Sequence, residues 1–173
     1  MKQLFLIVVV TYIFFPASAQ ELNQQEKQLY KIITEYRKSA NLPEVPVSKS
    51  LTTVAQTHVK DLQNNKPVTN TCNMHSWSSN GKWQPVCYTG DRKSAELMWS
   101  KPRELTSYKG DGYEIAYYTS ADFNPENALK SWKESKGHND VIMNKGIWTR
   151  SWNAMGIGVY GNYAVVWFGV EKD

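Results

Sequence analysis

The C-terminal stretch from Tyr163 to Val170 most restricts the possible fold, because both faces of this predicted strand are apolar. Alternation divides its side chains into two sets: Tyr163, Val165 and Trp167 on one face, and Ala164, Val166 and Phe168 on the other. A strand of this kind is buried on both sides, so the sheet that contains it needs a layer above and a layer below. Amphipathic helices elsewhere in the chain can supply both layers.

A second strand, Met155 to Tyr160, precedes this one across Gly161 and Asn162, a two-residue turn of the kind that tolerates positive φ. The two strands are expected to form an antiparallel hairpin. Gly156 and Gly158 leave one face of the first strand bare, which allows another element to approach its backbone closely.

Gly112 to Tyr118 predicts a third strand. Its side chains alternate between Tyr113, Ile115 and Tyr117 on one face and Glu114, Ala116 and Tyr118 on the other. Glu114 is therefore a carboxylate flanked by apolar residues. Burial of an unpaired charge is costly, so we expect Glu114 to be paired, bound to a ligand or placed at the edge of a cleft.

Helices are predicted before and between these strands. Their positions are Gln24 to Ser39, a segment capped by Ser48 or Ser50 that continues to Leu62, Ser94 to Ser100, and a helix that Asn124 caps and Pro125 opens. Together the elements predict an α+β fold, a three-layer α-β-α sandwich with a central antiparallel sheet. His58 lies on the apolar stripe of the second helix and is interpreted as a hydrogen-bonded packing residue.

The segment from Trp132 to Asn144 contains one of the three histidines of the chain. A helix is expected to end at Gly137, where a residue without Cβ turns a helix end at little cost. His138 would then be the first side chain beyond that end, held by local backbone geometry and suited to binding a ligand or transferring a proton. The same residues also fit a surface C-cap glycine followed by a solvated histidine.

The N-terminus predicts export from the cytoplasm. Lys2 precedes an apolar run from Leu4 to Phe15, and Ala17-Ser18-Ala19 forms a small-x-small cleavage site. Residues 1–19 are therefore interpreted as a signal peptide and residues 20–173 as a single domain that is secreted or periplasmic. The apolar run is short for a membrane span, and no other segment approaches the ~20 apolar residues that a span requires.

Cysteine content and charge narrow the function further. Two cysteines in an exported chain, Cys72 and Cys87, predict one disulfide that holds the loop containing His75. Closing that loop is worth about 3 kcal/mol in the chain-entropy model. The formal charge of +4 is spread along the chain and includes Lys2, whereas nucleic-acid binders concentrate basic residues on one face. Nucleic acid is therefore not an expected partner.

Several segments in order resemble the CAP superfamily, the cysteine-rich secretory, antigen 5 and pathogenesis-related proteins, in the SCP-like form of bacterial secreted domains. The matching segments are an early helix, Cys72 to Ser76, Gly112 to Ile115, Trp132 to Asn144, and the closing hairpin that ends in Trp167-Phe168-Gly169. The resemblance covers nearly the whole mature chain. It implies the same α-β-α sandwich that the residue patterns predict.

The resemblance also implies a cleft lined by two histidines and two acidic residues. Carried over by position, His75 corresponds to the first histidine, Glu114 to the first glutamate and His138 to the second histidine. The second glutamate is absent, because Ser135 stands three residues after Trp132 where the family pattern has glutamate. Glu134 is displaced by one residue, about 100° around a helix. The expected cleft is His75, Glu114, Ser135 and His138, and the candidates for catalysis are Glu114, Ser135 and Glu134.

In the family the two histidines can hold a divalent metal such as zinc, which points to His75 and His138 here. Glu114 is available as a third ligand or as a base acting through water. Structural zinc sites use four protein ligands and hydrolytic sites three plus water, so this set predicts weak, exchangeable binding. In the alternative interpretation Glu114 hydrogen-bonds an imidazole and the group only ties loop, strand and helix together.

Three functions remain open. The first is a secreted, monomeric binding module whose cleft holds a divalent metal and a small apolar or amphipathic molecule, such as a lipid. The second is a metal-dependent hydrolase acting on a peptide or cell-wall polymer. The third is an extracellular interaction protein with a purely structural His/Glu cluster. The chain has no Gly-x-Ser-x-Gly and no His-Glu-x-x-His motif, which together with Ser135 favours binding over catalysis.

Overall fold

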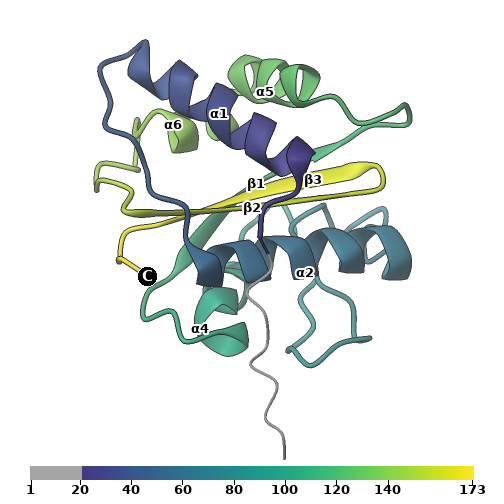
Figure 1. The fold of residues 1–173 in the computed structure, drawn as a ribbon. Coiled ribbons are helices and arrows are strands. Elements are labelled where there is room, and N and C mark those ends of the chain that lie inside the picture. The colour runs from purple at the N-terminus through teal and green to yellow at the C-terminus, as the bar shows by residue number, and fades with distance from the viewer. Residues whose placement is uncertain (1–20) are drawn as a thin grey trace, which may run out of the picture.

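The computed structural model describes residues 21–173, so the predicted signal peptide at residues 1–19 lies outside the described residues. A three-stranded antiparallel sheet of order β1-β3-β2 separates two layers of helices in this part of the chain (Figure 1). The strands are β1 (Gly112–Tyr118), β2 (Ala154–Tyr160) and β3 (Tyr163–Gly169). The predicted α+β sandwich is thereby confirmed.

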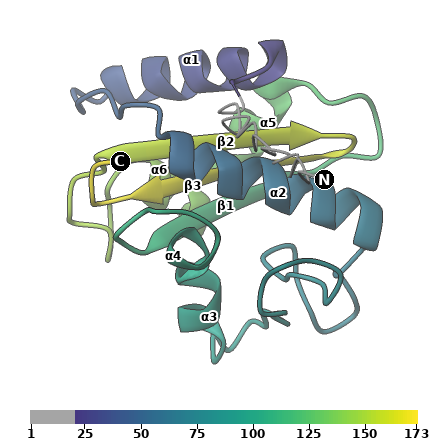
Figure 2. The same ribbon diagram turned by 60° about the horizontal axis from the view of Figure 1, so that its bottom comes forward.

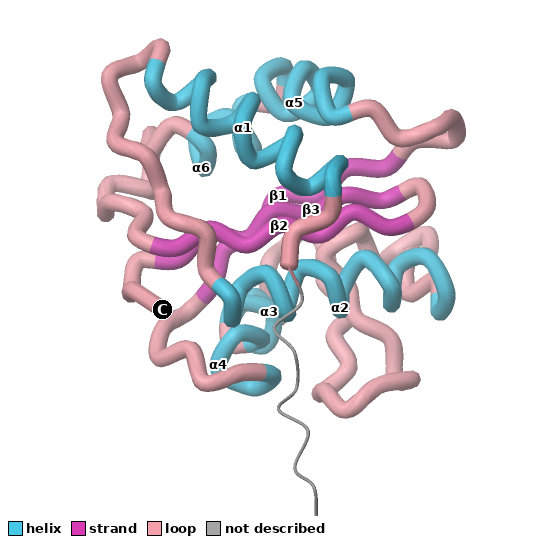
Figure 3. The backbone as a smooth tube through the Cα atoms, in the orientation of Figure 1, coloured by secondary structure: helices cyan, strands magenta, loops and turns pink. Residues whose placement is uncertain are grey.

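One face of the sheet is covered by α1 (Gln24–Lys38), α5 (Pro125–Glu134) and α6 (Lys136–Ile142). The other face is covered by α2 (Lys49–Asn65), with α3 (Ala95–Trp99) and α4 (Lys101–Leu105) beside it (Figure 2). A long irregular segment joins α2 to α3 on that side (Figure 3). None of the helices in residues 21–173 is long and apolar enough to cross a membrane.

The central strand β3 carries the core on both of its faces, as its sequence predicts. Val165 and Trp167 pack into the apolar cluster on the α2 side. Ala164, Val166 and Phe168 pack into the cluster under α1 and α5. All five are fully buried, so neither helical layer can be removed without exposing one face of this strand.

The glycines of β2 bring a helix directly onto the sheet. A Cβ at Gly156 would lie 2.0 Å from the carbonyl carbon of Leu51, and one at Gly158 would lie 2.4 Å from that of Ala55. Both contacts are with the backbone of α2, which confirms the close approach expected from the bare strand face.

One local expectation needs correction, and one short helix was not predicted. The helix does not end at Gly137: α5 ends at Glu134, because Ser135 has extended φ and ψ angles of −88° and 110° and interrupts the hydrogen-bond ladder. The chain then re-enters a helix at Lys136, so Gly137 and His138 lie in the first turn of α6. Beyond the predicted helical segment that stops before Pro102, a further short helix begins at Lys101, because proline fits the first turn of a helix.

Candidate functional site

The segment between α2 and α3 forms one wall of the site. Cys72 and Cys87 are joined by the predicted disulfide. Inside that closed loop Trp77 and Val86 exchange backbone hydrogen bonds of 2.8 and 3.0 Å. The disulfide and this pair of backbone hydrogen bonds hold an otherwise irregular segment in one conformation. The position of His75 on this wall is therefore determined by the fold.

Glu114 joins this wall to the sheet. Its Oε2 accepts a 2.8 Å hydrogen bond from Nδ1 of His75, and its Oε1 lies 2.5 Å from Nδ1 of His58. The Glu114 side chain is fully buried, whereas that of His75 is 20% exposed. Both carboxylate oxygens are thus engaged, and the expectation that Glu114 is paired is confirmed.

His58 is the member of the site that sequence reasoning did not assign to it. Its Nε2 lies 3.0 Å from the backbone carbonyl of Ser76, and its ring stacks on Trp77 at 4.2 Å between centroids. A carbonyl can only accept, so Nε2 carries a proton. Both ring nitrogens of His58 are thus engaged, and the expectation of a hydrogen-bonded packing role is confirmed.

The protonation of Glu114 follows from the same contacts. Burial by itself raises the pKa of this carboxyl. The charge of His58 and the hydrogen bonds from His58 and His75 outweigh burial, so the pKa of Glu114 is lowered overall. The carboxylate at Nδ1 also selects the tautomer of a neutral His75 ring, in which the proton lies on Nδ1 and Nε2 has a free lone pair.

His138 lies across the site from His75, with 6.4 Å between the two ring centroids. Burial, assisted by the neighbouring His75, lowers the pKa of His138 to about 4. The ring is therefore neutral at ordinary pH. Its nitrogens make no hydrogen bond within residues 21–173, so a lone pair is available to a ligand.

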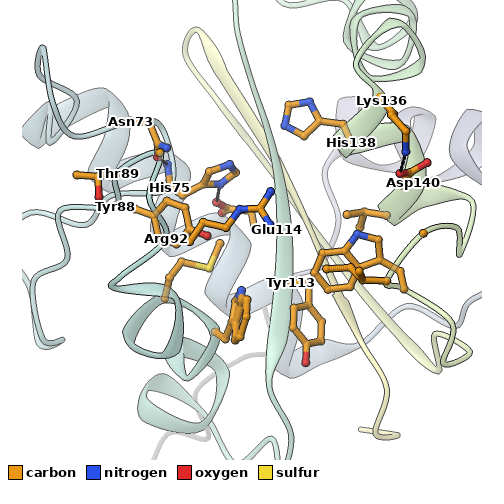
Figure 4. A pocket seen from close by; sticks show the side chains of 18 residues that line it. Asn73, His75, Tyr88, Thr89, Arg92, Tyr113, Glu114, Lys136, His138 and Asp140 are labelled. Carbon is orange, nitrogen blue, oxygen red and sulfur yellow. Dashed lines mark hydrogen bonds and ion pairs between the residues drawn. The ribbon is translucent and has the colours of Figure 1, made fainter.

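A cavity of about 670 Å³ opens between these histidines (Figure 4). One wall is the segment that carries His75, the other is α6 with the loop around Trp148, and β1 forms the floor. Tyr113 on this floor packs against Trp99 at 5.5 Å and Trp148 at 4.9 Å between ring centroids. The cavity thus has a histidine end and an aromatic end.

Not every expected residue lines this cavity. His75, Glu114 and His138 do, whereas Glu134 and Ser135 do not. Glu134 ends α5 with an exposed side chain, and Ser135 occupies the bend before α6. The residue that follows them at the cavity wall is Lys136, which is paired with Asp140.

His75 and His138 are the residues of this cavity that would hold a metal ion. His75 Nε2 and the neutral ring of His138 supply two lone pairs, but both oxygens of Glu114 are already engaged. Among residues 21–173, no group of three or more His, Cys, Asp or Glu side chains is placed to hold an ion. With Zn–N bonds of ~2.0–2.1 Å, the present ring separation is near the largest that one ion can bridge.

A family model defines the class of protein to which this fold and cleft belong. The model of the CAP family, the cysteine-rich secretory protein family, matches residues 30–168. The chain therefore belongs to the CAP family. A comparison with curated proteins finds no significant match.

Solved structures of bacterial proteins share the fold. An outer surface protein of Borrelia burgdorferi is 19% identical with a TM-score of 0.59, over 89% of this chain and 99% of its own. An extracellular SCP-domain protein of Bacillus anthracis is 19% identical with a TM-score of 0.58, over 85% of this chain and 40% of its own. A cysteine-rich secretory protein of Staphylococcus aureus is 17% identical with a TM-score of 0.54, over 85% and 39%. At these identities the likeness concerns the fold alone.

Proposed function

We propose that this chain is an extracytoplasmic CAP-domain binding module. Its cleft takes a small apolar or amphipathic ligand and weakly binds a divalent metal through His75 and His138. The observation that carries this proposal is a cavity with two metal-competent imidazoles at one end and three packed aromatic rings at the other. Export is supported by the signal-peptide pattern at residues 1–19 and by similar bacterial proteins described as extracellular or outer surface proteins.

The residues of the cleft have two roles: the histidine end binds polar groups, and the aromatic end binds apolar groups. His58 and Glu114 hold His75 with its Nε2 free, and the buried surroundings of His138 keep that ring neutral. A bound zinc ion would supply a Lewis-acid centre for an oxygen atom of the ligand. Trp99, Tyr113 and Trp148 supply apolar surface for the body of the ligand.

Zinc titration by calorimetry is expected to show weak binding to the wild type that falls at least tenfold in His138→Ala. This variant is chosen because the His138 ring makes no hydrogen bond within residues 21–173, so its removal spares the fold. Glu134→Ala, outside the cavity, is the matched control and should bind zinc as the wild type does. Equal zinc binding in His138→Ala, or none in the wild type, would remove the metal from the proposal.

Intrinsic fluorescence is expected to change when delipidated protein is titrated with a panel of sterols, fatty acids and phospholipids, because Trp99 and Trp148 line the cavity. Trp148→Phe should reduce this change and retain most of the affinity. Trp167 is buried and does not line the cavity, so Trp167→Phe is the control and should leave the ligand-induced change in fluorescence in place. An unchanged spectrum and an unchanged melting temperature across the panel would contradict a lipid-like ligand.

A further inference from the structure

The floor of the cavity is an edge strand, and the ladder shows which of its backbone groups are unpaired. In the order β1-β3-β2, the carbonyl of Gly169 in β3 accepts from Asn153 N on the β2 side. The N–H and C=O of successive residues point to opposite edges of a strand. The N–H and C=O of Phe168 therefore point to β1, where they pair with Tyr113. The next residue of β1, Glu114, must then direct its N–H and C=O away from the sheet.

A separate contact agrees with this alternation. The indole Nε1 of Trp132 donates a 2.9 Å hydrogen bond to the carbonyl of Ala116, two residues after Glu114 and on the same edge. Trp132 thus covers the strand edge at Ala116. At Glu114 neither main-chain group meets a hydrogen-bond partner within residues 21–173.

The main chain of Glu114 also reaches the cavity. Glu114 as a whole is 7% exposed, although its side chain is completely buried. The exposed part is therefore backbone, and Glu114 lines the cavity. The site presents an adjacent amide donor and carbonyl acceptor at the bottom of a cleft, where edge strands elsewhere are usually covered.

We propose that the cleft binds an extended peptide segment, which adds to β1 by pairing its own main chain with Glu114. This inference rests on the proposed function of a ligand-binding cleft and assigns the ligand class. An N–H and a C=O side by side on an open strand are matched by another peptide backbone, the basis of strand addition in peptide recognition. An alkyl chain has no hydrogen-bonding group, and a sterol has only a single hydroxyl, whereas a peptide residue supplies both an N–H and a C=O at the spacing of a strand.

The walls of the cleft suit the side chains of such a strand. Consecutive side chains of an added strand point to opposite faces of the sheet. They would therefore point alternately towards the wall with His75 and the wall with His138, which face each other across β1 (Figure 4). A large apolar side chain would pack on Trp99 and Trp148 at the aromatic end.

Charge favours a peptide that carries a carboxylate. Arg92 lines the cavity and is solvent-exposed, and it forms no ion pair within residues 21–173. The other cation of the wall, Lys136, is already paired with Asp140. An acidic side chain or a free C-terminal carboxylate would complement Arg92, so Arg92→Gln is expected to weaken such a peptide about tenfold.

The test begins with selection of binders from a random heptapeptide library with the purified protein, followed by an N-methyl scan of the best peptide. Methylation removes a backbone N–H, as proline does. Affinity is expected to fall at least tenfold, ~1.4 kcal/mol, at the amide that faces Glu114. The adjacent amides point away from β1 and serve as matched controls that should tolerate the methyl group. In amide exchange the N–H of Glu114 should be slowed by the unmodified peptide.

Other outcomes overturn the proposal. Peptide binding that tolerates a methyl group at every position, or that leaves Glu114 exchange unchanged, would show that the main chain of β1 is not the docking surface. If the library yields no binder while zinc still binds the wild type and not His138→Ala, the peptide inference fails and the metal-binding cleft stands. If the wild type binds no zinc but the peptide still pairs with Glu114, the metal-binding proposal fails and the peptide inference stands.

Discussion

Gly156→Ala is expected to destabilise the protein by about 4 kcal/mol, at the upper end of what single substitutions do. The added Cβ would lie 2.0 Å from the carbonyl carbon of Leu51 and 2.3 Å from the backbone nitrogen of Thr52. These atoms belong to the backbone of α2, so no side-chain rotation can relieve the clash. The helix must move off β2, which opens the core on that side of the sheet. Urea denaturation of variant and wild type measures the loss as a lower midpoint.

Gly137→Ala provides the matched control for this prediction. Gly137 lies in the first turn of α6, and a Cβ there would meet nothing within 4 Å. Alanine is favoured over glycine in helices, so this variant is expected to be neutral or more stable by ~0.5–1 kcal/mol. If both glycine variants lost the same stability, contact with α2 would not be the cause in Gly156→Ala.

Most of the fold could be predicted from residue periodicity, because burial acts on each strand face separately. The alternating apolar sets of Tyr163 to Val170 required two covering layers, and Gly112 to Tyr118 was placed at the bounds that β1 has. The end of the helix after Trp132 was misplaced. Glycine can end a helix but also occurs inside one, and here the extended backbone of Ser135 interrupts the helix before Gly137 is reached.

The site could be predicted only in part. Resemblance placed His75, Glu114 and His138 in one cleft, and the three do line one cavity. His58 was assigned to the core, because helical periodicity predicts burial but not which group a buried side chain meets. The pairing of the two could have been predicted, because a histidine on the buried face of α2 and a carboxylate among apolar residues of β1 each need a polar partner in the core. The open edge at Glu114 depends on strand order, which no local pattern specifies.

Glu114→Ala is expected to cost about 4 kcal/mol of stability, because it breaks a buried charge pair by removing one partner. His58 would keep the carbonyl of Ser76 as acceptor for Nε2, but its Nδ1 would face a cavity without an acceptor. His75 would also lose the hydrogen bond that sets its tautomer. Thermal and urea denaturation measure the first effect, and the ¹⁵N shifts of the His75 ring report the second.

Glu114→Gln separates the hydrogen bonds from the charge. The amide oxygen can accept from His75, and the amide NH₂ can donate to Nδ1 of a neutral His58, so each ring nitrogen keeps a partner. This variant is expected to lose less than half of the stability that Glu114→Ala loses.

Glu134→Ala is the control, because it removes an exposed carboxylate at the end of α5, and it should change stability by no more than ~0.5 kcal/mol. A cost for Glu114→Ala as small as that of Glu134→Ala would mean that the His58–Glu114–His75 chain does not support the fold. An equal and large cost for Ala and Gln would mean that the charge, and not the hydrogen bonding, holds loop, helix and strand together at the cleft.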